Sequence, residues 1–362
     1  MRRPLIVSTL LAATVALAGC STGAPTTVSA GSADKTAEVL TVANIEKVIA
    51  SYPGDVTKLP TSFGEPAERA AKIGWSSPRT ANELVGRLGL SIEKAVADMG
   101  GTLVSYDADA DVSRQVGQMQ QLINDKVDAI VVWPLDATAL APVMKQAKAA
   151  NIPVVAMEAT PNADGDIGDA AGQVIYGRDL GAYVAASLMA ELHPGGEVAV
   201  SKFAVPVPSI MYYAERASYW ATQKGLKVVG TYDNMSDDVA GGQAMASPVI
   251  AKYPNLVGLL SYNDATAMGA TTAAKAAAKN LLAFGQNGED SGVEAVRSGK
   301  LALTYQPPVV DWGRELVRGA YLASEGKEIP KAVFTGPGTF ITSANIGTAK
   351  KMQDLILSAY GS

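Results

Sequence analysis

Short apolar runs alternate with longer stretches of helical periodicity from Lys72 onward, and this alternation constrains the fold more than any other feature of the chain. Four apolar runs have the length and composition of strands: KIGWS, TLVSYD, DAIVVWP and PVVAME. The stretches between them, such as NELVGRLGLSIEKAVADMG, have helical spacing. Such an alternation argues for a parallel sheet covered by helices on both faces.

The pattern starts again with a helix expected at about 173–192, followed by further strands in EVAVSKF, LKVVGTY, LVGLLSY, LLAF and LALTYQ. We therefore predict an α/β protein with two doubly wound parallel-sheet lobes joined by a three-strand hinge. The expected lobes are residues 72–172 with 307–336, and residues 173–306 with 337–362. Ligands of open parallel sheets bind beyond the carboxyl ends of the strands, so we expect a cleft lined by strand tips between the lobes.

The first twenty residues, MRRPLIVSTLLAATVALAGC, have the organisation of an export signal. Arg2 and Arg3 form a positive n-region, and the apolar stretch after them is too short to span a bilayer. The end of the segment, LAGC, resembles the bacterial lipobox, in which the cysteine is acylated and becomes the first mature residue. We therefore expect a signal peptide at 1–19 and lipidation of Cys20. The alternative is an ordinary signal peptide with an unrelated cysteine.

Residues 20–38 are rich in Ser, Thr, Ala and Gly and lack apolar periodicity, which predicts a flexible tether. Residues 39–71 are expected to form an N-terminal extension with a short helix in LTVANIEKVIASY, and the sequence leaves the role of this extension open. Cys20 is the only cysteine, so no disulfide can form within the chain. The expected location is outside the cell's interior, with the lipid anchored in the outer face of the cytoplasmic membrane. The net charge is −5, so the chain lacks the excess of positive charge that nucleic-acid-binding proteins use to bind phosphates.

Polar and aromatic side chains follow the ends of most predicted strands. This mixture suits a small polyhydroxylated solute, because amides and carboxylates bond neighbouring hydroxyls and aromatic faces pack on C–H surfaces. Any one of these polar residues could instead be a helix N-cap, which is common just after a strand. The tip residues that we expect to bind the solute are Ser76, Ser77, Trp133, Glu158, Phe203, Asn263, Asn287 and Gln306.

Three stretches resemble the ribose-binding-protein-like family, the type I periplasmic binding proteins of bacterial ABC importers. They are residues 111–158 (DVSRQVGQMQQLINDKVDAIVVWPLDATALAPVMKQAKAANIPVVAME), LLSYNDATAMGA and SGKLALTYQPP. The similarity covers roughly residues 72–345. It implies a substrate-binding lipoprotein that takes a monosaccharide or sugar alcohol in the inter-lobe cleft and delivers it to the permease subunits of an ABC importer. We expect it to act as a monomer.

The resemblance also implies roles for single residues in the second lobe. Asn263 falls on a family asparagine that contacts sugar hydroxyls, with Asp264 beside it as a helix cap or a support. Arg216 falls on a family arginine, and Asn287 replaces a family aspartate. Gln306 lies within one residue of the family's hinge glutamine.

In the first lobe, Glu158 occupies the family's carboxylate position after the fourth strand. The tip of the first strand, SSPRTANE, lacks the aromatic pair that family members place around a sugar ring. Trp133, Phe203 or Trp75 would have to replace that pair. This departure favours a sugar other than ribose, or a linear polyol.

An enzyme is the main rival class. Glu158 and Asp264 could form a glycosidase pair, and GEDSG with His193, the only histidine, faintly resembles a serine-protease site. No spacing in the sequence supports either of these enzymes, so we expect no catalytic residue, no cofactor and no metal site. The sequence also leaves open a ligand-binding sensor for a membrane receptor, and a binder of a small solute that is not a sugar.

Overall fold

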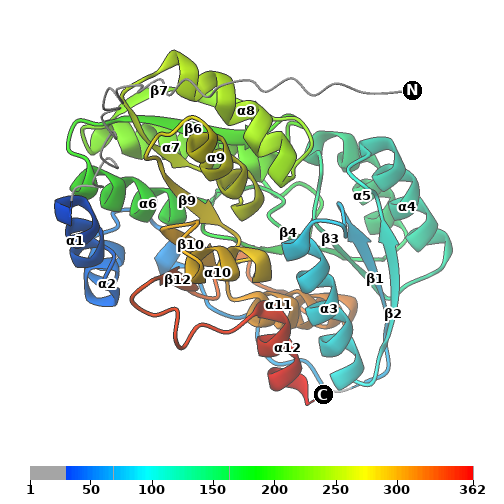
Figure 1. The fold of residues 1–362 in the computed structure, drawn as a ribbon. Helices are drawn as coiled ribbons and strands as arrows, with labels where there is room; N and C mark the ends of the chain where they lie inside the picture. The colour runs from blue at the N-terminus through cyan, green and yellow to red at the C-terminus, as the bar shows by residue number, and fades with distance from the viewer. Residues whose placement is uncertain (1–29, 68, 163, 362) are drawn as a thin grey trace, which may run out of the picture.

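Two lobes, each built around a six-stranded sheet, make up the computed structural model, which describes residues 30–67, 69–162 and 164–361 (Figure 1). The strands of the first sheet, in the order in which they lie side by side, are β11 (Ala332–Val333), β5 (Gly172–Val174), β4 (Val154–Met157), β3 (Ala129–Val132), β1 (Lys72–Ser77) and β2 (Thr102–Asp107). Those of the second are β12 (Thr339–Thr342), β10 (Leu303–Gln306), β9 (Leu282–Gln286), β8 (Leu256–Leu260), β6 (Glu197–Phe203) and β7 (Lys227–Asn234). Paired strands are parallel except for β10 and β12, which run antiparallel.

Helices cover both faces of each sheet. In the first lobe they are α3 (Glu83–Asp98), α4 (Val112–Asn124), α5 (Ala137–Ala149) and α11 (Val309–Ser324). In the second they are α6 (Arg178–Leu192), α7 (Pro208–Gln223), α8 (Val239–Lys252), α9 (Asp264–Ala276) and α10 (Asp290–Arg297). The predicted class of two doubly wound α/β lobes is confirmed.

Strand β3 shows why such a run is apolar throughout. Successive side chains of a strand point to opposite faces of the sheet. Ala129 and Val131 therefore enter the core shared with α3 and α11, while Ile130 and Val132 enter the core shared with α4 and α5. A strand buried on both faces has no polar side to alternate with, so it is a continuous apolar run.

The chain crosses between the lobes after β5, after β10 and after β11, which are the three crossings expected of the hinge, and it crosses again after β12, because α12 lies on the first lobe. The expected first boundary, after residue 172, falls inside β5, because the predicted helix at 173–192 begins only at Arg178. β5 has only three residues, which are too few to show the alternating pattern of a strand, so it could not be predicted from the sequence. The C-terminal segment also differs from expectation: α12 (Met352–Tyr360) packs on α3 and α11 of the first lobe, burying Met352 and Ile356.

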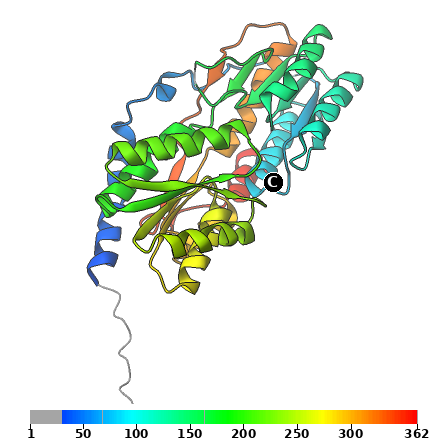
Figure 2. The same ribbon diagram turned by 90° about the horizontal axis from the view of Figure 1, so that it is seen from above.

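The N-terminal extension also joins the two lobes. Residues 30–38, which composition predicts as tether, form most of helix α1 (Ala30–Val39), and α2 (Val42–Ala50) follows. Both pack on α6 of the second lobe, where Lys35 Nζ donates to the Leu192 backbone oxygen at 2.9 Å. The chain then runs through the short 3-10 helix η1 (Val56–Lys58) to the first lobe, along one side of the molecule (Figure 2).

The predicted signal peptide and Cys20 lie outside the described residues. Within the described part of the chain, no helix combines the length and the apolar character needed to cross a membrane.

Candidate functional site

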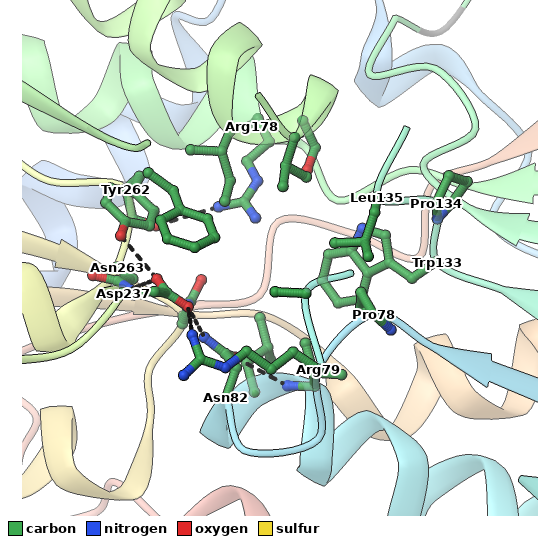
Figure 3. A pocket seen from close by; sticks show the side chains of 18 residues that line it. Pro78, Arg79, Asn82, Trp133, Pro134, Leu135, Arg178, Asp237, Tyr262 and Asn263 are labelled. Atoms are coloured by element: carbon green, nitrogen blue, oxygen red, sulfur yellow. Dashed lines mark hydrogen bonds and ion pairs between the residues drawn. The ribbon is translucent and has the colours of Figure 1, made fainter. Parts of the chain in front are cut away.

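A cavity lies between the lobes, where the carboxyl ends of strands from both sheets face each other (Figure 3). Its volume is about 70 Å³, roughly five times what one buried water requires, so a small solute fits. The first lobe contributes Pro78, Arg79, Asn82, Leu84, Val85, Ala110, Trp133, Pro134 and Leu135. The second contributes Arg178, Phe203, Val207, Ser209, Ile210, Asp237, Tyr262, Asn263 and Asn287.

Asp237, in the loop between β7 and α8, is the centre of the polar side of the cavity. Its Oδ1 accepts hydrogen bonds from the Tyr262 hydroxyl and from Asn263 Nδ2, both at 2.8 Å. Its Oδ2 accepts from Asn82 Nδ2 at 3.2 Å and lies 3.9 Å from Arg79 Nη1. Burial raises the pKa of Asp237, and the donors around it oppose that rise.

The opposite side of the cavity is aromatic and apolar. Trp133 follows β3 directly and is held edge-on against Trp312 of α11, with ring centroids 6.5 Å apart. Trp312 in turn packs edge-on against Tyr176 at 4.7 Å. Phe203 ends β6 on the other lobe. Of these rings, Trp133 and Phe203 line the cavity and offer apolar faces to the C–H surface of a solute.

Arg178, the first residue of α6, is a buried cation of the cavity wall. Its guanidinium lies 3.7 Å from the centre of the Tyr176 ring, and Nη1 donates to the Tyr262 backbone oxygen at 3.4 Å. Its Nε lies 3.8 Å from Glu158, whose carboxylate is fully buried behind the wall. Burial raises the pKa of Glu158 to about 7, although the charge of Arg178 opposes the rise.

Among the residues that the structure describes, none forms a hydrogen bond of normal geometry with either Glu158 oxygen or with Arg178 Nε, and all three atoms are buried. Ser209 lies close enough to lower the pKa of Glu158, but no hydrogen bond of normal geometry joins them. Buried polar groups in native proteins are nearly always paired, and of Glu158 and Arg178 only Arg178 lines the cavity, where its guanidinium can bond a solute or water.

Three residues at the site have left-handed backbone conformations. The φ angles are 51° at Glu158, 57° at Asp237 and 94° at Asn287. Positive φ is uncommon for residues other than glycine and clusters at ligand-binding sites, where the surrounding structure holds it in place.

Four of the predicted tip residues line the cavity: Trp133, Phe203, Asn263 and Asn287. The two amides are largely engaged with the protein itself. Asn263 Oδ1 caps α9 by accepting from the Thr266 backbone nitrogen at 2.9 Å, and Nδ2 donates to Asp237. Asn287 Oδ1 accepts from the Tyr176 hydroxyl at 2.9 Å, and Nδ2 donates to Glu289 at 3.1 Å.

The neighbour of Asn263, Asp264, supports the loop before α10. Asp264 Oδ2 accepts from the Glu289 backbone nitrogen at 2.9 Å, while Asn263 is the N-cap of α9. The sequence left two roles open for Asp264, a helix cap or a support for neighbouring residues. Its hydrogen bond to the Glu289 backbone corresponds to the support.

The other predicted tip residues do not line the cavity. Ser76 and Ser77 are fully buried at the end of β1, and Glu158 stands behind Arg178. Gln306 Nε2 donates to the backbone oxygens of Gly288 and Lys350, both at 3.1 Å, at a hinge crossing.

Arg216 lies about two turns further along α7 than Ser209 and does not line the cavity. It forms an ion pair of 2.5 Å with Asp179 of α6, and Trp220 Nε1 donates to the same carboxylate at 2.6 Å. The buried cation at the cavity is Arg178, so the arginine expected from the resemblance is replaced by one from the adjacent helix.

Six polar residues of the cavity were not predicted: Arg79, Asn82, Arg178, Ser209, Asp237 and Tyr262. Arg79 and Asn82 lie in SSPRTANE, the tip of which only Ser76 and Ser77 were expected to bind the solute. Arg178 was hidden inside a helix predicted to begin earlier. Among the described residues, no cluster of three or more His, Cys, Asp or Glu side chains could hold a metal ion.

Comparison with known proteins agrees with this architecture. A family model described as "Periplasmic binding protein domain" matches residues 73–328. The ribose import binding protein RbsB of Bacillus subtilis is 26% identical over 284 residues, covering 76% of this chain and 90% of the relative. A xylitol-binding protein of Mycolicibacterium smegmatis is 27% identical over 249 residues, covering 65% of this chain and 64% of the relative.

Solved structures share the fold. One is a periplasmic solute-binding protein of an ABC transporter from Actinobacillus succinogenes, with bound D-allose, which superposes with a TM-score of 0.70 at 22% sequence identity. The superposition covers 77% of this chain and 100% of that protein. An ABC transporter solute-binding protein from Bacillus halodurans, with bound myo-inositol, gives a TM-score of 0.67 at 21% identity, covering 78% of this chain and 98% of its own.

Proposed function

Since the chain belongs to the periplasmic binding protein domain family, we propose that it is the extracytoplasmic substrate-binding lipoprotein of an ABC importer and takes a monosaccharide or sugar alcohol. The family and the type I fold confirm the predicted resemblance, and the relatives are binding proteins rather than enzymes. The observation that carries the proposal is the inter-lobe cavity, with Trp133 and Phe203 on its walls and hydrogen-bonding groups from both lobes.

The chemistry of the wall supports a neutral polyhydroxylated solute. Arg178 offers guanidinium donors to hydroxyl oxygens, and its charge is balanced by Glu158, so the pair adds no net charge when Glu158 is ionised. The aromatic rings cover the C–H face of the same solute. Two relatives support this class, since one is named for ribose import and another for xylitol binding.

Binding would proceed by closure of the lobes. In an open form the strand tips face solvent, and a solute that touches both lobes shifts the population towards the closed form. Trp133 would meet the solute from the first lobe, and Arg178 from the second. The closed form would then deliver the solute to the permease subunits.

Anchoring through lipid on Cys20 is part of the proposal and rests on the lipobox-like LAGC. The chain between Cys20 and α1 would hold the protein at the outer face of the cytoplasmic membrane. Labelling of the full chain with a radioactive or clickable fatty acid tests this, since Cys20→Ser should abolish the label. Persistent labelling of that variant would contradict anchoring at Cys20.

A thermal-shift screen of the chain beginning at Ser21 tests the solute class. Pentoses, hexoses, alditols and inositols are compared with nucleosides and amino acids. A solute at a hundred times its dissociation constant should stabilise the protein by about 2.7 kcal/mol. A response confined to one carbohydrate series supports the proposal, and a response only to the non-sugar compounds contradicts it.

A further inference from the structure

The two lobes contact each other directly across the cavity through one carboxylate of the second lobe. Asp237 Oδ2 accepts a hydrogen bond from Asn82 Nδ2 at 3.2 Å and lies 3.9 Å from Arg79 Nη1 (Figure 3). Arg79 Nη1 also donates to the Ser236 backbone oxygen at 3.3 Å. Arg79, Asn82 and Asp237 are called the polar clasp below.

The second lobe holds Asp237 in position for this contact. Its Oδ1 accepts from Tyr262 and Asn263, and its backbone nitrogen donates to Asn234 Oδ1 at 3.1 Å. Asn234 is itself fixed, because its Nδ2 donates to Thr266 Oγ1 at 2.8 Å. The loop thus presents Asp237 to the first lobe in one conformation, and its side chain is only 8% exposed.

Protein donors occupy most of the acceptor positions of the Asp237 carboxylate. A carboxylate offers about four acceptor positions on its two oxygens. Here Tyr262 and Asn263 occupy Oδ1 and Asn82 bonds Oδ2, while Arg79 Nη1, 3.9 Å from Oδ2, contributes an ion pair without a hydrogen bond. Although Asp237 lines the cavity, its bonds therefore join protein to protein.

We propose that Asp237 is a positioning residue for lobe closure, which stabilises the closed form through Arg79 and Asn82 without contacting the solute. The inference rests on the proposed function, in which the lobes close on a solute. The apparent dissociation constant of a ligand equals its intrinsic value divided by the fraction of protein in the binding-competent state. Loss of the clasp should therefore multiply the dissociation constants of all solutes by one common factor.

The first arm of the test needs no solute. Spin labels on Lys145→Cys of α5 and Gln243→Cys of α8, both exposed, report the distance between the lobes in the chain beginning at Ser21. Asp237→Asn keeps the size of the side chain but removes its charge and turns one oxygen into a donor. We expect the distance distribution to shift to longer values. A distribution identical to that of the unsubstituted chain would overturn the proposal.

Asp238→Asn is the matched control. Asp238 is the N-cap of α8, where its Oδ1 accepts from Gly241 at 2.7 Å, and asparagine caps a helix equally well. Within the described part of the chain, no hydrogen bond or ion pair joins Asp238 to the first lobe, and only the more distant charge of Arg79 acts on it, so its distance distribution should shift far less than that of Asp237→Asn. A shift as large as that of Asp237→Asn would attribute the effect to the loop and overturn the proposal.

The second arm measures dissociation constants by calorimetry for every solute that binds. Asp237→Asn should raise each of them by about five- to tenfold and by the same factor. Factors that differ between solutes would mean direct contact and would contradict the proposal. Because the first arm stands without a solute, failure of the sugar hypothesis and failure of the clasp remain distinguishable.

Arg79→Ala tests the clasp from the other lobe, should Asp237→Asn fold poorly. The Arg79 side chain is 31% exposed, so its truncation leaves the core intact. It should lengthen the label distance as Asp237→Asn does, and the double substitution should add little to the larger single effect. Fully additive effects would show that the two residues act separately and would contradict the clasp.

Discussion

At the scale of single residues, Trp133 is both a wall of the cavity and part of the hydrophobic core. It is 5% exposed and packs against Trp312. We expect Trp133→Ala to lower the free energy of unfolding by about 3 kcal/mol and to weaken solute binding by at least about tenfold. Denaturant unfolding and calorimetry measure the two effects. Trp133→Phe keeps an aromatic face and should retain most of both; equal losses in the two variants would contradict an aromatic contact.

Glu158 should make the stability depend on pH. Burial raises its pKa from 4.5 to about 7, so the native state keeps a proton that the unfolded chain releases. The contribution of Glu158 to stability is therefore complete below pH 4.5 and is lost as the pH rises through about 7. The loss amounts to at most about 3 kcal/mol.

Glu158→Gln, which does not titrate, isolates this effect. Burial also raises the pKa of Asp264, to about 8, so both proteins should lose stability with rising pH. The unsubstituted chain should lose more between pH 5 and pH 7.5, as measured by urea unfolding at each pH. Parallel stability profiles would mean that Glu158 is ionised throughout that range.

The cavity residues that could be predicted from the sequence are those at or directly after the end of a predicted strand. Trp133 and Asn263 were predicted because an apolar run ends immediately before them. Asp237 lies three residues beyond the end of β7. Its backbone has a left-handed φ of 57°, and no sequence pattern predicts that conformation. Arg216 shows the opposite error, since its helix was predicted correctly but only the first turn of α7 reaches the cavity, and Arg216 lies about two turns beyond it.

At the scale of elements, α3 is the helix that holds the second lobe. Its N-cap Asn82 reaches Asp237, and Glu83 in its first turn accepts from the Asp290 backbone nitrogen at 2.5 Å and from Ser291 Oγ at 2.9 Å. Helix α10 has no side-chain cap from its own N-cap residue, Glu289. Glu83, a residue of the other lobe, therefore accepts a hydrogen bond from one of the free backbone N–H groups at the N-terminus of α10, and its negative charge favours that end of the helix.

Glu83→Ala should accordingly lower the free energy of unfolding by about 1 kcal/mol, as the loss of an N-cap does. It should also speed amide hydrogen exchange in the first turn of α10. Glu93→Ala is the control, because Glu93 is an exposed residue of the same helix. The interpretation fails if the two variants unfold at the same denaturant concentration.

The elements themselves were largely predictable, and the exceptions share a cause. β2 was predicted to the residue as TLVSYD, since two glycines precede it and it ends at an aspartate before a turn. β5 was missed because its three residues gain their stability from pairing with β4 and β11 rather than from a pattern of their own. Likewise, α12 was placed on the wrong lobe because nine residues after a hinge crossing do not specify their partner.

At the scale of the whole molecule, the N-terminal extension adds a connection beside the hinge. On the second lobe, the Tyr52 hydroxyl donates to Asp179 at 2.7 Å. On the first lobe, the Phe63 backbone nitrogen donates to Glu315 at 2.8 Å, and Pro60 accepts from the Phe334 backbone nitrogen at 2.9 Å. The sequence left this role open because a Pro-punctuated segment has no period, and its order comes from the surfaces that it covers.

Phe63 is the residue through which this extension joins the core of the first lobe. It is 6% exposed, and its ring packs where Gly172 of β5 and Gly319 of α11 leave room. Removing a buried phenylalanine side chain typically costs about 3–5 kcal/mol. We therefore expect Phe63→Ala to lower the free energy of unfolding by about 3 kcal/mol and to speed hydrogen exchange in β5 and β11.

Tyr52→Phe is the matched comparison on the other lobe, since it removes only the hydroxyl that bonds Asp179. Its expected cost is about 1 kcal/mol. If Phe63→Ala costs no more than Tyr52→Phe and leaves exchange in β5 unchanged, the extension lies on the first lobe without stabilising it. If the larger loss is found, residues 39–71 are part of the folded body, and any shortened chain must begin before them to keep both lobes intact.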